Sequence, residues 1–455
     1  MALTTVILAA GQGKRMNSDM PKVLQPLGGG NMLSHVLDTA AALESKVINV
    51  VYGHGGEAVP KAFPELTVDW TLQAEQLGTG HALGQALPGI PEDHQILVLF
   101  GDVPLVTVVS LSALLGEVPT GGIALLTVFL EKPCGYGRIL RNDEGAVTAI
   151  VEDKDATPAQ RAINEINTGM MAAQASSLRR WVEVLNDDNH QGEFYLTDVI
   201  AMAVGEGAPV VSVSVADPDE VLGVNDRVQL AAAERVLQRR YAQDVMARGA
   251  TLADPGRFDL RGALTIGRDV FIDVGVVFSG DVVLGDRVQI GPNAIISDTS
   301  LGDDCRVHEH CVIDGVVAGA HCEIGPFARL RPGTEFEERV KVGNFVEVKA
   351  SSVAPGSKMN HLSYVGDTRV GQDVNIGAGT ITCNYDGAAK HRTQIGDRVF
   401  VGSGAMLVAP LEIGAGATIA AGSTITKNVP GEALAVERNR QATVKGWKRP
   451  TKPAK

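Results

Sequence analysis

The chain has 455 residues, of which 45% are hydrophobic and 20% charged, and its formal net charge is −13. This length predicts two or three domains, and the lack of any run of about 18 apolar residues argues against a membrane span. The acidic balance argues against a general nucleic-acid binder, because a phosphate backbone requires a basic face.

The N-terminal segment and the cysteines indicate a cytoplasmic protein. The short apolar stretch near the N-terminus has no basic residue before it and no cleavage-type segment after it. It therefore favours a buried first strand over a signal peptide. Five cysteines, odd in number and without a C-x-x-C pair, favour free thiols in a reducing compartment over a disulfide framework or a zinc site.

Residues 1–225 have the pattern of a doubly wound α/β domain. Helical stretches such as residues 31–43 separate apolar segments. Four continuous apolar runs are typical of strands buried on both faces of a parallel sheet, at 6–10, 47–53, 96–102 and 123–130. Ligands of such sheets lie at the carboxyl ends of the strands, so the loops after the first and third runs are the expected site.

Residues 226–248 are predicted to form one long helix that links two domains. Apolar residues recur there at helical spacing, and Gly249 follows where a helix C-cap glycine belongs.

Residues 249–455 are predicted to form a left-handed parallel β-helix with a C-terminal tail. From Ala263 onward, six-residue units such as IGRDVF, LGDRVQ and IGAGAT begin with an aliphatic residue that is usually followed by a small one. A hexapeptide is one side of a triangular coil of about 18 residues. The segment 382–393 breaks this period, so we expect it to leave the coil as a functional loop.

Phosphate chemistry is indicated at the end of the first strand. Gly11 and Gly13 would allow the backbone to approach a phosphate, although a lone G-x-G is also found in simple tight turns. Arg15 and Lys22 follow, and cations are what a transferring nucleotidyl group requires. Asp102 ends the third apolar run and is either a Mg²⁺ ligand or a helix N-cap.

Acyl chemistry is indicated by polar residues that interrupt the hexapeptide repeat. Arg331 and Lys349 are one coil apart and should stack on one edge of the prism. His361 and Tyr364 follow in the next coil. A coil histidine is often a surface residue, but beside two stacked cations it would be a base in a phosphate pocket, as acyl transfer to an aminosugar phosphate requires.

The order of motifs resembles that of the bacterial sugar-nucleotide pyrophosphorylases. It is most similar to the bifunctional family of N-acetylglucosamine-1-phosphate uridyltransferases, and the resemblance spans the whole chain. The motifs that carry it are LAAGQGKRM (8–16), PKVL (21–24), LQAEQLGTGHA (72–82), FGDVP (100–104), GYGRI (135–139), EINTG (165–169), GEFYLTD (192–198) and GVNDR (223–227). The chain departs from the family pattern at Gln12, Lys14 and Phe100, and Lys14 either adds a phosphate contact or faces solvent.

The resemblance implies a magnesium-dependent uridylyl transfer from UTP in the first half. Arg15 and Lys22 would be catalytic and hold the phosphates, and Asp102 and Asn225 would bind Mg²⁺. The uridine nucleotide would be held by Leu8, Ala9, Ala10, Gly11, Gln73, Gly78, Thr79, Phe100 and Gly101. The sugar would be held by Gly137, Glu152 and Asn167.

For the second half the resemblance implies N-acetylation of glucosamine-1-phosphate by acetyl-CoA. His361 would be the general base, and Asn384 of the NYDG motif would stabilise the oxyanion. The aminosugar phosphate would be bound by Arg331, Lys349, Tyr364 and Asn375. Acetyl-CoA would be bound by Ala378, Asn384, Tyr385, Ser403, Ala421 and Arg438.

The resemblance further implies a homotrimer with acetyl-CoA sites between subunits, and a product that feeds peptidoglycan and, where present, lipopolysaccharide. The basic tail after Arg438 would either cover the coenzyme of a neighbouring subunit or be a solvated terminus. A second hypothesis keeps the nucleotidyltransferase and makes the β-helix regulatory or oligomeric. A third makes the protein a non-enzymatic assembly subunit, which the intact Gly11, Arg15 and Lys22 disfavour.

Overall fold

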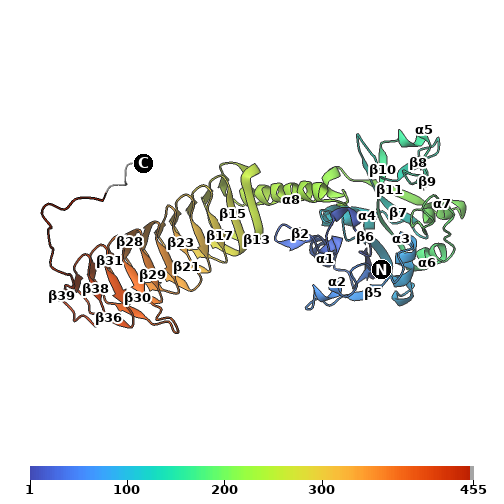
Figure 1. Cartoon of the computed structure of the whole chain (residues 1–455). Coiled ribbons are helices and arrows are strands. Elements are labelled where there is room, and N and C mark those ends of the chain that lie inside the picture. The colour runs from blue at the N-terminus through green and yellow to red at the C-terminus, as the bar shows by residue number, and fades with distance from the viewer. Residues whose placement is uncertain (451–455) are drawn as a thin grey trace, which may run out of the picture. The chain divides into compact units, whose positions relative to one another are not determined.

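The computed structural model describes residues 1–450 and divides into two units, Met1–Leu237 and Gln238–Lys455 (Figure 1). The division falls within helix α8 (Arg227–Ala247), in the segment for which a linker helix is predicted. No helix within residues 1–450 is long and apolar enough to cross a membrane.

The first unit is built on a sheet whose strands follow the order β11-β7-β10-β6-β1-β4-β5, with β8 and β9 as a hairpin beside β10. The strands are β1 (Leu3–Leu8), β4 (Val47–Tyr52), β5 (Asp69–Leu72), β6 (Gln95–Phe100), β7 (Ile123–Phe129), β8 (Arg138–Arg141), β9 (Val147–Val151), β10 (Glu165–Gln174) and β11 (Val210–Ser214). Strand β1 pairs in parallel with β4 and β6, so the carboxyl ends of these strands share one edge.

Helices cover both faces of this sheet, because successive strand residues point to opposite sides. On one face, Val6 and Val98 pack in a cluster with α3 (Thr79–Ala86), α6 (Ala175–Val182) and α7 (Asp198–Gly205). On the other, Ile7 and Leu97 pack with α1 (Met32–Ala42) and α4 (Val108–Gly116). Within the described residues, the unit is thus the predicted doubly wound α/β fold.

Strand β10 departs from the expected parallel arrangement. It lies between β6 and β7 and runs antiparallel to both. Its register shifts between Asn167 and Met171, which indicates a β-bulge. Because the strand is reversed, its beginning lies at the edge where the parallel strands end, and this brings Asn167 to the edge of the sheet that carries Asp102.

The second unit is a stack of parallel strands consistent with the predicted left-handed β-helix (Figure 1, yellow to red). One sheet consists of β12 (Thr251–Leu252), β14 (Phe271–Ile272), β16 (Gln289–Ile290), β19 (Arg306–Val307), β22 (Glu323–Ile324), β25 (Lys341–Asn344), β28 (Lys358–His361), β31 (Asn375–Ile376), β34 (Phe400–Val401), β37 (Thr418–Ile419) and β39 (Leu434–Ala435). A second, 17-stranded sheet runs from β13 (Phe258–Ile266) to β38 (Thr424–Ile425).

The interior of the β-helix is filled by the aliphatic residue of each repeat. Ile290, Val307 and Ile324 occupy equivalent places in consecutive coils and are buried. The glycine that often follows cannot be replaced without a clash, since a Cβ added at Gly291 would lie 2.9 Å from the Glu309 backbone nitrogen one coil away. The spacing between coils therefore requires glycine at position 291, whereas the equivalent corner of the next coil carries His308.

The open edge of the β-helix is closed by the second half of α8. The buried side chain of Gln238 donates to the carbonyl of Leu260 over 2.8 Å and accepts the amide of the same residue over 2.7 Å. Leu260 belongs to β13, which is the first strand of the 17-stranded sheet. Ala242 and Val245 of α8 are fully buried in the β-helix core.

Candidate active sites

The glycine-rich loop follows β1 directly at the carboxyl edge of the sheet. Leu8, Ala9 and Ala10 are buried, whereas Gly11 is exposed. Gly13 has a φ of 61°, and a Cβ added there would lie 2.6 Å from the Cβ of Lys22. Glycine at this position is thus what allows the loop to lie against the lysine.

Lys22 brings the two predicted metal ligands together. Its ammonium is hydrogen-bonded to Asp102 Oδ2 and donates to Asn225 Oδ1 over 2.9 Å. Lys22 is 9% exposed, so the ammonium is held in a largely desolvated position. Two oxygen acceptors from separate segments therefore converge on a single cation.

This pair of oxygens fits Mg²⁺, which is usually bound by one or two protein oxygens together with substrate phosphates. No group of three or more His, Cys, Asp or Glu side chains within residues 1–450 is arranged to hold a metal ion. A metal at Asp102 and Asn225 would therefore depend on phosphate oxygens to complete its coordination.

The segment after β5 forms a second wall at the same edge. Gln73 is 3% exposed, and its Nε2 donates to the Gly78 carbonyl over 3.1 Å and lies 3.0 Å from His81 Nδ1. Gly78 has a φ of 113°, and an added Cβ would lie 2.6 Å from the carbonyl oxygen of Phe194. Thr79 begins α3 and accepts the amide of Leu196 with its hydroxyl over 3.1 Å.

The predicted sugar-binding residues also lie together. A Cβ added at Gly137 would be 3.5 Å from both carboxylate oxygens of Glu152, and the Gly137 carbonyl accepts the amide of Asn167 over 2.8 Å. Among residues 1–450, the buried Oδ1 of Asn167 has no hydrogen-bond partner, as can be the case for a ligand-facing group. Phe100 packs against Gly169, whose added Cβ would lie 2.6 Å from the ring.

Burial raises the pKa of two side chains in this pocket, Glu152 and Tyr136. Desolvation raises the pKa of Glu152, and neighbouring acids including Asp198 raise it further, while a hydrogen bond from Thr197 over 3.1 Å opposes the shift. Tyr136 lies near Asp102, and burial is the main cause of its raised pKa. Tyr136 stands in the quoted GYGRI motif, yet sequence reasoning assigned it no role.

Arg15 is the predicted phosphate ligand that the structure does not bring to this group. Arg15 and Lys14 are both exposed on the loop. In the part of the chain that the structure describes, no hydrogen bond or ion pair joins Arg15 to Lys22, Asp102 or Asn225.

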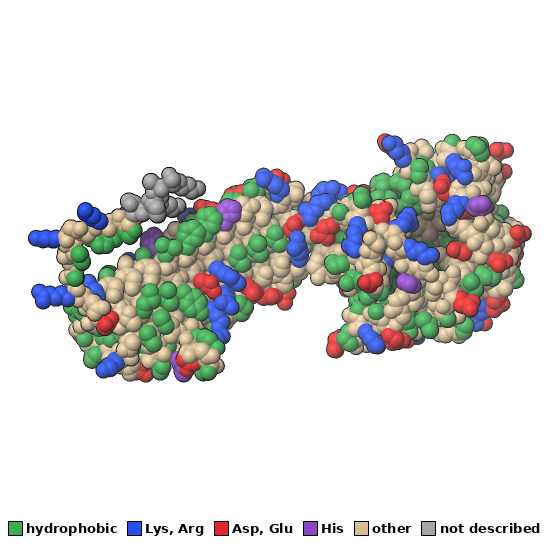
Figure 2. Space-filling model, in the orientation of Figure 1, with side chains coloured by type: hydrophobic (Ala, Val, Ile, Leu, Met, Phe, Trp, Pro, Cys, Tyr) green, Lys and Arg blue, Asp and Glu red, His purple; other side chains and the backbone are tan. Residues whose placement is uncertain are grey.

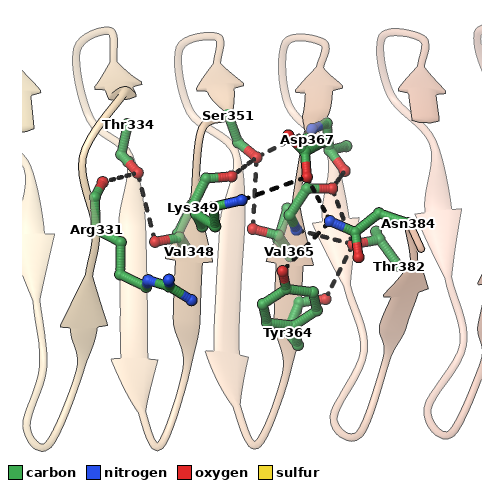
Figure 3. Close-up of polar contacts among 12 residues, drawn as sticks. Arg331, Thr334, Val348, Lys349, Ser351, Tyr364, Val365, Asp367, Thr382 and Asn384 are labelled. Atoms are coloured by element: carbon green, nitrogen blue, oxygen red, sulfur yellow. Dashed lines mark hydrogen bonds and ion pairs between the residues drawn. The ribbon is translucent and has the colours of Figure 1, made fainter. Parts of the chain in front are cut away.

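In the β-helix, Arg331 and Lys349 lie side by side on neighbouring coils, as their spacing predicts (Figure 3). Arg331 donates to Glu347 Oε1 over 2.9 Å, and Lys349 Nζ lies 3.8 Å from Asp367 Oδ2. Each cation is thus held by a carboxylate of the next coil.

Asn384 and Tyr364 meet at the same place (Figure 3). The Nδ2 of Asn384 is hydrogen-bonded to Asp367 Oδ2 and donates to the Tyr364 hydroxyl over 3.3 Å. Both amide hydrogens are therefore engaged. The side chain can donate to an oxyanion only by releasing one acceptor, and the longer bond to Tyr364 is the weaker of the two.

His361 ends β28 at the corner that leads to Tyr364 in β29 (Tyr364–Gly366). Its Nδ1 lies 2.9 Å from Asn344 Oδ1 on the preceding coil. An amide oxygen can only accept, so Nδ1 carries the hydrogen and Nε2 is left to take a proton. Asn375 is separated from this group, since it aligns with Lys358 at the start of β28.

Three of the residues predicted to bind acetyl-CoA form a column. Ala378, Ser403 and Ala421 follow strands that pair in register, and backbone bonds join the Ala378 carbonyl to Gly404 over 2.7 Å and the Ser403 carbonyl to Gly422 over 2.8 Å. A Cβ added at Gly422 would lie 3.9 Å from Arg438 Cδ, so the arginine lies beside the column. Basic side chains continue along the exposed tail after β39 (Figure 2).

Three residues near these groups escaped sequence reasoning. Asn344 fixes the His361 ring, Asp367 contacts both Lys349 and Asn384, and Lys390 lies close enough to Lys349 that its pKa is lowered. Asn344 was detectable from its position one coil before His361. Lys390 lies on the insertion, where the repeat gives no register.

Comparison with known proteins gives consistent matches to both halves. Residues 5–133 match the family model of the MobA-like NTP transferase domain, 260–358 that of the GMPPB C-terminal domain, and 392–427 that of the bacterial transferase hexapeptide. A relative from Alkalilimnicola ehrlichii, named "Bifunctional protein GlmU", is 59% identical over 449 residues, which cover 99% of this chain and 97% of that protein. A relative of the same name from Marinobacter nauticus is 53% identical over 99% of both chains.

Among solved structures, a nucleotidyl transferase from Methanothermobacter thermautotroptrophicus is 19% identical with a TM-score of 0.39, and the match covers 52% of this chain and 99% of that one.

Proposed function

The chain belongs to the family of bifunctional GlmU proteins, and on this basis we propose which residues perform its two reactions. It is a uridyltransferase and an acetyltransferase of UDP-N-acetylglucosamine synthesis. We assign the nucleotidyltransferase to residues 1–225, the linker to 226–248 and the acetyltransferase to 249–455.

In acetyl transfer, the amine of glucosamine-1-phosphate attacks the thioester carbonyl of acetyl-CoA, the C–S bond breaks, and the coenzyme leaves as a thiolate that takes up a proton to give the free thiol. His361 takes the proton from the amine at Nε2, because Asn344 occupies Nδ1. Arg331, Lys349, Tyr364 and Asn375 bind the substrate, and Lys390 adds a third cation near its phosphate. Two observations carry this assignment: Arg331 and Lys349 lie on neighbouring coils, and Asn344 holds the ring of His361.

Acetyl-CoA is assigned to the column of Ala378, Ser403 and Ala421, where small side chains leave room for the pantetheine arm, and to Asn384 and Tyr385 on the adjoining loop. Arg438 is positioned beside the column to bind the coenzyme phosphates. His361 and Asn375 lie on one sheet and Lys349 on the other. This division supports a site shared between neighbouring copies, in a homotrimer that sedimentation would detect.

In uridylyl transfer, a phosphate oxygen of N-acetylglucosamine-1-phosphate attacks the α-phosphorus of UTP, and pyrophosphate leaves. Lys22 and Arg15 bind the negative charge that builds on the α-phosphate. Mg²⁺, held by Asp102 and Asn225, would supply further charge neutralisation.

The nucleotide and sugar occupy the two walls of this site. With Nε2 of Gln73 engaged, its Oε1 is left to accept the N3–H of uracil. Leu8 to Gly11, Gly78, Thr79, Phe100 and Gly101 enclose the nucleotide, and Gly137, Glu152 and Asn167 bind the sugar.

Two assays of one purified preparation test the assignment. Thiol release is measured from acetyl-CoA with glucosamine-1-phosphate, and pyrophosphate release from UTP with N-acetylglucosamine-1-phosphate and Mg²⁺. We expect both. Pyrophosphate release without thiol release, from a folded protein, would leave the β-helix as an assembly module and overturn the acetyltransferase assignment. We further propose a cytoplasmic location.

A further inference from the structure

The insertion that interrupts the β-helix is a closed loop between β32 (Ile381–Cys383) and β33 (Thr393–Ile395). At its base the amide of His391 donates to the carbonyl of Asn384 over 2.8 Å, and an antiparallel bridge joins Tyr385 to Lys390. The loop thus begins at Asn384, which contacts Tyr364 and Asp367, and returns through Lys390, which has Lys349 and Asp367 among its neighbours.

The tip of this loop is organised by one carboxylate. Asp386 Oδ1 accepts the amides of Ala388 and Ala389 over 2.8 and 2.7 Å, and Oδ2 lies 2.7 Å from His391 Nε2. The Ala389 amide, the His391 side chain and the Ala388 amide hold the pKa of Asp386 well below its usual range. The anion therefore persists at any pH where the enzyme would work.

Such a restraint is needed because Lys390 is held beside another cation. Lys349 lies close enough to lower the pKa of Lys390, and Asp367 only partly offsets the repulsion. Two ammonium groups side by side favour an open loop unless an anion lies between them or the loop is held closed. The bonds of Asp386 provide that closure without touching the substrate pocket itself.

We propose that Asp386 is a positioning residue for acetyl transfer, which closes the loop 384–391 and holds the Lys390 ammonium beside Lys349, where both bind the phosphate of the sugar substrate. The proposal rests on the acetyltransferase assignment. It gives the aspartate of the NYDG motif a role in substrate binding through Lys390, distinct from the direct contacts assigned to Asn384 and Tyr385.

A double-mutant cycle with Asp386→Ala and Lys390→Met tests this role. The KM and kcat of acetyl transfer are measured, together with the Kd of glucosamine-1-phosphate by calorimetry. Lys390→Met should raise the KM for the sugar about 10- to 100-fold, the range of one hydrogen bond to a charged group. Asp386→Ala should raise it by a similar factor with kcat nearly unchanged, and the double variant should resemble Lys390→Met alone.

Matched variants separate positioning from general damage. Asp386→Asn keeps an oxygen for the two amides and should have a smaller effect, and Asp281→Ala, an exposed acid three coils before Arg331, should have none. Uridylyl transfer and the melting temperature should be unchanged in every variant.

Two results would overturn the proposal: an unchanged KM and Kd in Asp386→Ala, or single effects that multiply in the double variant. Failure of the acetyltransferase assignment looks different, because thiol release would then be missing from the unsubstituted protein. The calorimetric Kd would still report whether Asp386 and Lys390 act together on the sugar phosphate.

Discussion

The two halves of this chain assemble their sites in different ways. In the α/β unit, Lys22, Asp102 and Asn225 come from segments far apart in sequence. The parallel strands β1 and β6 end at one edge, and the segment before α8 returns to that edge, where the Val224 amide donates to the Asp102 carbonyl. In the β-helix, Arg331 and Lys349 meet because they are one coil apart. In a repeat, the number of residues between two positions predicts how far apart they lie in space. In the α/β fold, residues come together through the order of the strands, which cannot be read from the local sequence.

The largest effect is expected from a substitution that disables the acetyltransferase site and leaves the other site intact. His361→Ala should lower the rate of acetyl transfer about 10²- to 10⁴-fold, as expected when a general base is lost. Uridylyl transfer should be unchanged, because His361 lies in the β-helix unit. Thiol and pyrophosphate release from the same preparation measure both. A parallel fall in uridylyl transfer would show that the sites are not independent.

The reciprocal change is Lys22→Met, which removes the cation between Asp102 and Asn225. Uridylyl transfer should fall about 10²- to 10³-fold, the loss seen when one preorganised donor to a charged transition state is removed. Acetyl transfer should be unaffected. Lys14→Met is the control, since Lys14 is exposed on the same loop. An equal loss in the control would place Lys14 on the phosphates as well.

A smaller effect is expected from blocking the column of small residues. Ser403→Leu should raise the KM for acetyl-CoA about 10-fold, because the larger side chain enters space expected for the pantetheine arm. The KM for the sugar and the melting temperature should change little, as the position is exposed. Ser352→Leu, exposed on another strand, is the control. Equal KM values in both variants would exclude this column as the coenzyme site.

The smallest effect concerns Glu152. Burial raises its pKa in the folded state, so the carboxyl favours the protonated form and the fold loses stability as pH rises through that pKa. Glu152→Gln, which mimics the protonated form, should raise the melting temperature of the first unit at pH 7.5 by about 2 °C. The gain should shrink towards about pH 4, where the acid is protonated in both states. Scanning calorimetry at both pH values measures this.

The strands and coils were predictable because the residues that become buried recur at a regular spacing in the sequence. The aliphatic positions of the hexapeptides became buried residues such as Ile290 and Val307, and the apolar runs became central strands. Strand β10 was harder to predict, because its direction depends on the hairpin before it and not on its own residues.

The site residues, too, could be predicted from the sequence where they lie in the repeat, but not where the topology of the fold brings them together. The stacking of Arg331 on Lys349 followed from coil length alone. By contrast, the assignments of Gln73, Glu152 and Asn167 needed a family resemblance, since nothing local marks them as neighbours of Asp102. Asp367 and Lys390 escaped because charged side chains in a coil or loop do not recur at a regular spacing.

The glutamine of α8 that binds both backbone groups of Leu260 has a consequence for solubility. A stack of parallel strands presents at its end a template onto which any extended chain can add, and this is how fibres grow. Gln238 satisfies the hydrogen-bonding groups of Leu260 on that edge strand, and the buried Ala242 and Val245 cover the core behind it. The helix thus acts as a terminator of polymerisation, which any isolated β-helix cut from this chain would have to retain.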